Sequence, residues 1–468
     1  MGCSILTTAI RVLRTPSPWF RLGLTALGRW LAALSLPLLD DEAYYWTWSR
    51  HLQWGYLDHP PAVAVLVATS TRLLGDAPWA VRVPSFLLAA STAWVVFHLT
   101  RELYGAQAAR RSPGLFHSVP LFVAGGVIAS PDAPLAFLWA VATWAAWRAL
   151  QGQHGAWWGV GMAVGLGMQS KYSMAFLVPP LALWVLQDPE LRRRPEPYGA
   201  AALAAALFLP NLVWNAHNGW QAFRFVVERG PWVQAGPAGN LLLSAGGVLL
   251  YLSPLLGVLL LVAPWRKTGP AERFLRALVV PTLVVSLVGA LAGKFKPHYL
   301  APAALLGVPC LAAWPEGRTA RWMPLATAAG AAQSAVVVAL AVAVLWNPAL
   351  LADQRGWDRV AQEVLHHAPA VVVTTTYQQA GQLSYALRER VPVAVLPGPH
   401  TFDQWSPLRR YNGQPALFIH DTRDPPPGGY AAWCRDPQPV GKVAYPGPQQ
   451  ALRTFALVRC GAFSPRPP

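Results

Sequence analysis

Long apolar runs separated by short polar connections make up most of the first 346 residues. An α-helix of about 20 apolar residues is long enough to cross the hydrocarbon core of a bilayer. The runs predict eleven membrane-spanning helices, near 19–39, 78–100, 113–129, 133–149, 156–171, 173–187, 198–213, 240–263, 276–292, 299–313 and 323–346. The pattern therefore predicts an α-helical polytopic membrane protein.

Segment 40–77 has a different pattern, in which aromatic and charged residues are mixed. Tyr44, Tyr45 and Trp46 stand beside Asp41 and Glu42, which makes the stretch too polar to span. Such a mixture is typical of a helix that lies in the plane of the membrane interface. Pro60 and Pro61 then predict the start of a second helix, because proline is favoured in the first helical turn. We expect two interfacial helices in an outer loop.

The composition changes again near residue 349. A β-branched run at 371–376 and later apolar runs alternate with helical and Pro/Gly-rich stretches, which predicts a small α/β domain. Its expected elements are strands at 371–376, 391–396 and 416–420, a helix at 378–390 and an irregular tail at 424–468. No glycine-rich dinucleotide motif follows the first strand. We therefore expect residues 1–348 to form a membrane domain and 349–468 a separate extracytoplasmic α/β domain.

Composition supports a membrane protein and excludes a soluble enzyme. Hydrophobic residues are 54% and charged residues 12% of the chain, about half the ~25% charged content of soluble domains. The net charge of +16 follows from Lys and Arg retained in cytoplasmic loops rather than from nucleic-acid binding. The predicted inner segments hold 16 Lys and Arg, and the outer segments hold 8, which predicts a cytoplasmic N-terminus and an outer C-terminus. The inner ones are Arg11, Arg14, Arg21, Arg101, Arg110, Arg111, Arg148, Arg192, Arg193, Arg194, Arg266, Lys267, Arg273, Arg276, Arg318 and Arg321.

Four cysteines lack the spacing of a metal site. Cys310 lies in an apolar run, where we expect an inert core residue. Cys434 and Cys460 both lie in the polar C-terminal part, where an extracytoplasmic location permits a disulfide. Sequence alone leaves a disulfide and two free thiols equally open.

The predicted topology sorts many ionisable groups to the outer face. Placing such groups near the apolar zone costs free energy unless they are paired or hydrated, and for that reason they are functional candidates. A carboxylate can take a proton from an acceptor, and cations can stabilise a departing phosphate. The outer candidates are Asp41, Glu42, Asp58, His59, Asp132, Lys171, Lys294, Lys296 and His298.

Each candidate also has a simpler interpretation. Asp41 and Glu42 suit a solvated helix end, Asp132 suits a turn between prolines, and Lys171 suits an interfacial lysine. The 294–298 loop suits acidic lipid headgroups. At the level of the whole chain, the alternatives to an enzyme are a lipid or solute transporter and a noncatalytic binding protein. A transporter is disfavoured because its polar groups usually lie near the membrane midplane between inverted repeats.

Several motifs resemble glycosyltransferase family 39, the family of protein O-mannosyltransferases and the lipid A aminoarabinose transferase. The longest is Asp41-Glu42-Ala43-Tyr44-Tyr45-Trp46-Thr47-Trp48-Ser49, which continues to Gly55-Tyr56-Leu57-Asp58-His59-Pro60-Pro61. Supporting motifs are Ser130-Pro131-Asp132-Ala133-Pro134-Leu135, Ser170-Lys171-Tyr172 and Trp214-Asn215-Ala216-His217-Asn218-Gly219-Trp220. The resemblance covers roughly residues 20–350.

The resemblance implies a GT-C fold and a polyprenyl-phosphate sugar donor used at the outer face of the plasma membrane, here a bacterial inner membrane. The acceptor it implies is a lipid, a glycan or a protein, among membrane lipids and without nucleic acid. Asp41 matches the family's catalytic acid or base, and Asp132 matches its partner in organising the acceptor or a metal. No cofactor is certain, but the resemblance leaves a divalent cation on Asp41 and Asp132 open.

The resemblance also assigns substrate-binding positions. Asp58 and His59 match an acidic–basic pair before proline, although the aminoarabinose branch carries Lys where this chain has His59. A histidine is charged only near or below its pKa, which makes phosphate binding there sensitive to pH. The other expected substrate-binding residues are Glu42, Tyr45, Lys171, Tyr172, Lys294, Lys296 and His298.

Overall fold

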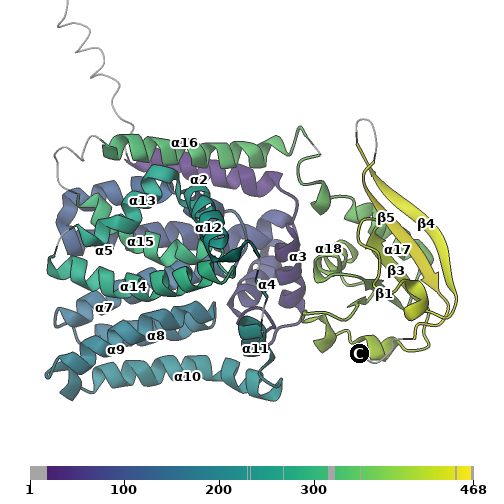
Figure 1. Cartoon of the computed structure of the whole chain (residues 1–468), viewed down its shortest axis with the longest axis horizontal. Coiled ribbons are helices and arrows are strands. Elements are labelled where there is room, and N and C mark those ends of the chain that lie inside the picture. The colour runs from purple at the N-terminus through teal and green to yellow at the C-terminus, as the bar shows by residue number, and fades with distance from the viewer. Residues whose placement is uncertain are drawn as a thin grey trace, which may run out of the picture.

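The computed structural model describes residues 18–464 except 229, 232, 267, 315–321, 348 and 448–450. The basic residues of the predicted cytoplasmic segments at 1–17, 267 and 315–321 therefore lie outside the described residues. The described chain has a helical part, at the left of Figure 1, and a sheet-containing C-terminal part at its right.

Helices overlap every predicted span. Their bounds are α2 Pro18–Ser35, α5 Pro78–His117, α6 Pro120–Gly125, α7 Asp132–Leu150, α8 Ala156–Met168, η1 Tyr172–Leu177, α9 Val178–Gln187, η2 Leu191–Arg193, α10 Glu196–His217, α11 Gln221–Glu228, α12 Gly236–Leu252, α13 Pro254–Val262, η3 Ala263–Trp265, α14 Pro270–Leu291, η4 Pro297–Leu300, α15 Ala301–Ala312 and α16 Trp322–Ala343. Among the described residues, four helices (α5, α10, α14 and α16) are long and apolar enough to cross a membrane by themselves. The count of eleven spans stays a prediction.

The predicted span 240–263 differs in shape from the expectation. It consists of α12 and a second helical stretch, Pro254–Trp265, bent by 98° relative to α12. Ser253 at the break has φ 71°, and Pro254 has no N–H to donate to the preceding turn. The serine–proline step therefore ends one helix and starts another, which a hydropathy pattern does not reveal.

Helix α8 packs closely between α7 and α10 through small residues. A Cβ on Gly165 would lie 2.8 Å from the Cβ of Leu207, and one on Gly161 would overlap the carbonyl oxygen of Ala200. Small residues let helix backbones approach closely where lipid offers no hydrophobic drive for association. The packing fixes α8, and the Ser170–Lys171 segment that follows it, against its neighbours.

The two expected interfacial helices are present as α3 (Asp40–Arg50) and α4 (Ala62–Leu74). Residues 42–49 of α3 are all buried, although they include Glu42, Thr47 and Ser49. Burial arises because α3 and α4 lie between the helical part and the C-terminal part (Figure 1). The polar face that suggested an interface with water instead faces protein.

The C-terminal part is a five-stranded mixed sheet with helices α17 (Trp357–His367) and α18 (Tyr377–Leu387). The strand order is β2-β1-β3-β5-β4, with bounds Val393–Val395, Val371–Thr374, Ala416–Asp421, Ala451–Cys460 and Pro437–Pro446. The predicted strand–helix–strand unit is present, and β2, β1 and β3 are parallel.

The expectation of an irregular tail at 424–468 is wrong. Strands β4 and β5 form an antiparallel pair, and β5 also pairs with β3. Register shifts between Pro439 and Gly441, and again between Tyr445 and Pro446, accommodate the prolines on β4. Proline is tolerated there because an edge strand has one row of backbone groups that needs no partner.

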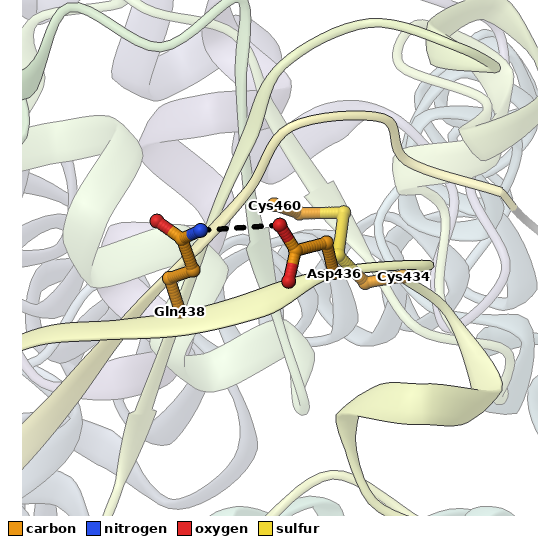
Figure 2. Close-up of a disulfide and its surroundings, with 4 residues drawn as sticks. All are labelled: Cys434, Asp436, Gln438 and Cys460. Atoms are coloured by element: carbon orange, nitrogen blue, oxygen red, sulfur yellow. Dashed lines mark hydrogen bonds between the residues drawn. A yellow bond between two sulfur atoms is a disulfide. The ribbon is translucent and has the colours of Figure 1, made fainter.

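Cys434 and Cys460 form a disulfide that ties the turn before β4 to the end of β5 (Figure 2). Beside it, the Gln438 side-chain amide donates to Asp436 Oδ2 over 3.1 Å. The alternative of two free thiols is excluded, whereas Cys310 is a buried free cysteine as expected.

Helix α18 docks directly on α3 (Figure 1). A Cβ on Gly381 would lie 2.9 Å from the backbone nitrogen of Tyr44, so the two helix backbones touch. Gln382 Nε2 donates to the Leu38 carbonyl and to Asp40 Oδ1, each over 2.9 Å. These contacts hold the C-terminal part against the helix that carries Asp41.

Candidate functional site

Helix α3 begins with three consecutive carboxylates, which suits the positive end of a helix dipole. The third, Glu42, is fully buried against Arg82 of α5, with Arg82 Nη2 donating to Glu42 Oε2 over 2.5 Å. Glu42 also accepts from the backbone nitrogens of Leu39, over 3.0 Å, and Ala129, over 2.9 Å. Glu42 therefore joins the start of α3 to the segment that leads to Asp132.

This environment changes the interpretation of Glu42. The sequence suggested a substrate-binding residue, whereas the structure encloses its carboxylate in contacts with the chain's own groups. Sequence reasoning also missed Arg82, which donates to the carbonyls at the end of α2 as well. An arginine inside the apolar run at 78–100 is the signal that would have identified it.

Asp132 and Lys171 form the central ion pair of the site. Lys171 Nζ donates to Asp132 Oδ1 over 2.7 Å, and His298 Nε2 lies 4.0 Å from Asp132 Oδ2. Ser170 Oγ donates to the Pro131 carbonyl over 2.7 Å, which fixes the two segments together. Three loops predicted on the same face thus meet at Asp132.

Tyr45 of α3 is buried, and its hydroxyl is sensitive to the charges of the site. Burial raises the pKa of Tyr45 well above its usual value, and the charges of Asp41, Asp58 and Asp132 raise it further. The His59 ring centroid lies 6.5 Å from that of Tyr45, and His59 also acts on the charge of Asp132. Charges from three separate segments therefore disfavour ionisation of this buried hydroxyl.

Charge balance keeps Asp132 ionised and His298 neutral. Burial opposes ionisation of Asp132, but Lys171 and His298 more than offset this and hold the pKa of the carboxyl below its usual range. Burial lowers the pKa of His298 to about 4, against the opposite effect of Asp132 and with the help of Lys171 and Lys296. At neutral pH, His298 is an uncharged proton acceptor or hydrogen-bond donor.

Two expected substrate-binding residues have contacts outside this cluster. Lys294 Nζ donates to the Val227 carbonyl of α11 over 3.1 Å. The Tyr172 hydroxyl accepts from Asn215 Nδ2 over 3.4 Å, and its ring stacks on Phe223. Through these contacts Lys294 joins α11, and Tyr172 joins α10 and α11.

The C-terminal part adds a residue that sequence reasoning missed. The Tyr377 ring, at the first residue of α18, lies 4.7 Å from that of Tyr44 between centroids. Tyr377 also acts on the Tyr45 hydroxyl. More than 300 residues separate these tyrosines in the chain, so no local pattern marks the contact.

The described residues do not fit a divalent cation. In the part of the chain that the structure describes, no group of three or more His, Cys, Asp or Glu side chains is arranged to hold a metal ion. The Asp132 carboxylate, one of the two ligands suggested by the resemblance, is already paired with Lys171. We therefore derive no chemical step through a metal.

Comparisons with known sequences identify relatives of part of the chain. Residues 58–214 match the family model described as dolichyl-phosphate-mannose-protein mannosyltransferase. The lipid A galacturonosyltransferase RgtD of Rhizobium johnstonii is 30% identical over 199 residues, which are 42% of this chain and 42% of that protein. An undecaprenyl phosphate-alpha-4-amino-4-deoxy-L-arabinose arabinosyl transferase of Pseudomonas fluorescens is 26% identical, over 58% of this chain and 51% of its own length. The matches thus span about half the length of these curated relatives.

Similarity of fold extends over nearly the whole chain. The crystal structure of ArnT from Cupriavidus metallidurans in the apo state has a TM-score of 0.66 at 15% identity, with 94% of this chain and 97% of that chain covered. The structure of the same protein bound to undecaprenyl phosphate has a TM-score of 0.66 at 14% identity, with 94% and 98% covered. The chain is a multi-pass membrane protein that shares the predominantly helical fold of these structures, and the resemblance of its sequence to the mannosyltransferase family is confirmed for residues 58–214.

Proposed function

We propose that the chain is a membrane glycosyltransferase that transfers a sugar from a polyprenyl-phosphate donor to an acceptor at the extracytoplasmic face. The observation that carries the proposal is the ion pair of Lys171 with Asp132 over 2.7 Å, with His298 Nε2 4.0 Å from the same carboxylate. Both curated relatives are sugar transferases by name, and the ArnT structure contains undecaprenyl phosphate. Because the Rhizobium relative acts on lipid A, a lipid acceptor is the first to test, before a glycan or a protein.

The proposed chemistry is a single displacement. Asp41, which is exposed at the start of α3, takes the proton from the acceptor hydroxyl as its oxygen attacks the anomeric carbon. The new glycosidic bond forms while the bond from that carbon to the phosphate oxygen breaks. The electron pair of the broken bond leaves with the polyprenyl phosphate.

Cations around Asp132 would bind the donor phosphate and stabilise its added charge on departure. Lys171 uses one of its three donors on Asp132, and two remain for phosphate oxygens. Lys296 and His59 lie in the same charge network, and His298, which is neutral at pH 7, can donate a hydrogen bond. Preorganised donors aimed at developing charge are usually the largest contribution to catalysis.

The proposal requires a defined sidedness. We propose that all eleven predicted spans cross the membrane, with residues 1–348 as the membrane domain, the N-terminus cytoplasmic and residues 349–468 extracytoplasmic. The Cys434–Cys460 disulfide supports this orientation, because disulfides persist in oxidising compartments and are rare in the cytosol. Cysteine labelling of positions 41, 132 and 171 from opposite faces of sealed vesicles tests it.

The central test is the exchange of Asp41 for Asn in the purified full-length chain. With an undecaprenyl-phosphate-linked sugar and bacterial envelope lipids in detergent, Asp41→Asn is expected to lower transfer by about 10²–10⁴-fold while folding is retained. Product is read as the added sugar mass on the acceptor by mass spectrometry. Transfer in detergent, where no compartments exist, also separates an enzyme from a transporter.

Asp40 provides the matched control. It is the neighbouring carboxylate on α3, but it accepts hydrogen bonds from Gln382 and Gln354. Asp40→Asn keeps the Oδ1 acceptor and is expected to retain transfer within a few-fold. Wild-type transfer by Asp41→Asn would remove Asp41 from the proposed role.

A further inference from the structure

Thr401 belongs to the C-terminal part, but its side chain bonds to the membrane part. The Tyr44 hydroxyl donates to Thr401 Oγ1 over 2.9 Å and accepts from the Thr401 backbone nitrogen over 2.8 Å. The Leu57 backbone nitrogen donates to the same Oγ1 over 3.2 Å. One buried threonine oxygen therefore joins helix α3 to the loop after it.

Both partners lie next to residues of the proposed site. Tyr44 precedes Tyr45 on the helix that begins at Asp40, and Leu57 directly precedes Asp58 and His59. The Tyr56 backbone nitrogen donates to the His59 carbonyl over 3.1 Å, and the chain bends at 57–59 to form the turn at 56–59. The hydrogen bond that Leu57 donates to Thr401 thus lies within that turn.

We propose that Thr401 is a positioning residue, through which the C-terminal part holds the turn at 56–59 against α3 and fixes where Asp58 and His59 stand relative to Asp132. The inference rests on the proposed function for its catalytic consequence, but the positioning itself does not depend on the identity of the substrate. It gives the C-terminal part a specific task in the site, beyond covering it.

Because the packing around Thr401 is close, the Tyr44 hydroxyl and the Leu57 N–H have few other acceptors within reach. Thr401 and Tyr44 are 1% and 2% exposed, and Phe402 stacks on Tyr44 with 5.7 Å between ring centroids. On another side of Tyr44, the Gly381 backbone is in direct contact with α3. If Oγ1 is removed, the Tyr44 hydroxyl and the Leu57 N–H lose their buried acceptor, and the turn can recover hydrogen bonds only by moving toward water.

The test compares Thr401→Val, Thr401→Ser and the wild type as full-length protein in nanodiscs. Valine keeps the shape and removes the oxygen, whereas serine keeps the oxygen. Thr374→Val is the matched control, because Thr374 is a buried threonine on β1 of the same sheet whose hydroxyl donates to the Thr376 carbonyl over 3.2 Å. It weakens the C-terminal part without touching the turn at 56–59.

Two measurements follow the turn and the site separately. In Thr401→Val, hydrogen exchange of the peptide containing the Leu57 amide is expected to become roughly tenfold faster. Affinity for undecaprenyl phosphate, used as the probe, is expected to fall roughly tenfold. Thr401→Ser is expected to restore both values, and Thr374→Val to leave both near wild type at a comparable loss of thermal stability.

The outcomes distinguish the possible failures. Unchanged exchange at Leu57 in Thr401→Val overturns the inference, as does an equal loss of probe affinity in Thr374→Val. If the wild type binds no undecaprenyl phosphate, the proposed donor is wrong, while the exchange measurement still decides whether Thr401 holds the turn. Should Thr401→Val fail to fold, Thr401→Ala removes the same oxygen, and unchanged exchange at Leu57 in that variant overturns the inference.

Discussion

Lys171 donates to Asp132 over 2.7 Å although 39 residues separate them in the chain. Their side chains are 14% and 29% exposed, so the pair is reachable from outside but only partly hydrated. A charge pair at that depth interacts more strongly than one in water. The pair keeps Asp132 ionised and leaves Lys171 with donors directed away from the carboxylate.

Replacing Lys171 by Met is expected to weaken binding of undecaprenyl phosphate by at least about tenfold, because a cation–phosphate contact is lost. Asp132 also loses its main partner, so its pKa is expected to rise. Isothermal titration with undecaprenyl phosphate measures the first effect. Lys442→Met removes an equal charge from exposed strand β4 and controls for net charge; equal losses in both variants would contradict a specific site.

Arg82→Met is expected to lower the free energy of unfolding by about 3–5 kcal/mol, because it leaves the buried Glu42 carboxylate without its cation. Thermal unfolding in detergent measures the change as a lower Tm. The double variant Arg82→Met/Glu42→Gln is expected to lose less free energy of unfolding than the two single variants lose when their losses are added. The exposed Arg148–Glu102 pair is the control, since Arg148→Met is expected to cost at most about 1 kcal/mol.

His298 predicts a dependence of stability on pH. Its pKa is about 4 in the folded chain against 6.5 for the free side chain, so the unfolded chain binds the proton more readily between these values. Stability is therefore expected to fall as the pH decreases from 6.5 to 4, by up to about 3 kcal/mol from this group. His298→Asn is expected to flatten that part of a Tm–pH profile. His366→Asn, at an exposed site on α17, is the control and should leave the slope in place.

Loss of the disulfide is expected to destabilise the C-terminal part. The two cysteines are 26 residues apart, and a loop of that length is stabilised by roughly 3 kcal/mol when closed. In the variant Cys434→Ser/Cys460→Ser, the sheet is expected to unfold at a lower denaturant concentration. Limited proteolysis between 424 and 464 measures this unfolding. A reducing agent should shift the wild type to the same value and have no further effect on the variant.

Much of the architecture was predictable because the bilayer imposes a strong pattern. Apolar length located a helix at every predicted span, and Pro60-Pro61 indicated the start of α4. The 98° bend at Ser253 was not predictable, since hydropathy does not encode backbone direction. Strands β4 and β5 were missed because the Pro and Gly residues that usually break strands here lie on an edge strand with register shifts.

For the candidate site, the predicted topology indicated which residues lie near one another better than it indicated their roles. Segments around Asp41, Asp58, Asp132, Lys171 and His298 were expected on one face, and the contacts of Asp132 with Lys171 and His298 join three of these segments. The burial of Glu42 depends on Arg82, 40 residues away. Contacts of Tyr377 and Thr401 with α3 depend on tertiary docking, which no local periodicity encodes.

The close approach of Gly381 to Tyr44 limits which C-terminal parts can be grafted onto this membrane part. A chimaera that grafts the C-terminal part of a relative onto this membrane part needs glycine at the equivalent of position 381. Any larger side chain would push the grafted part outward by about the width of a methyl group, and the tie at Thr401 would be lost with it. Modular exchange between relatives is thus governed by one missing side chain.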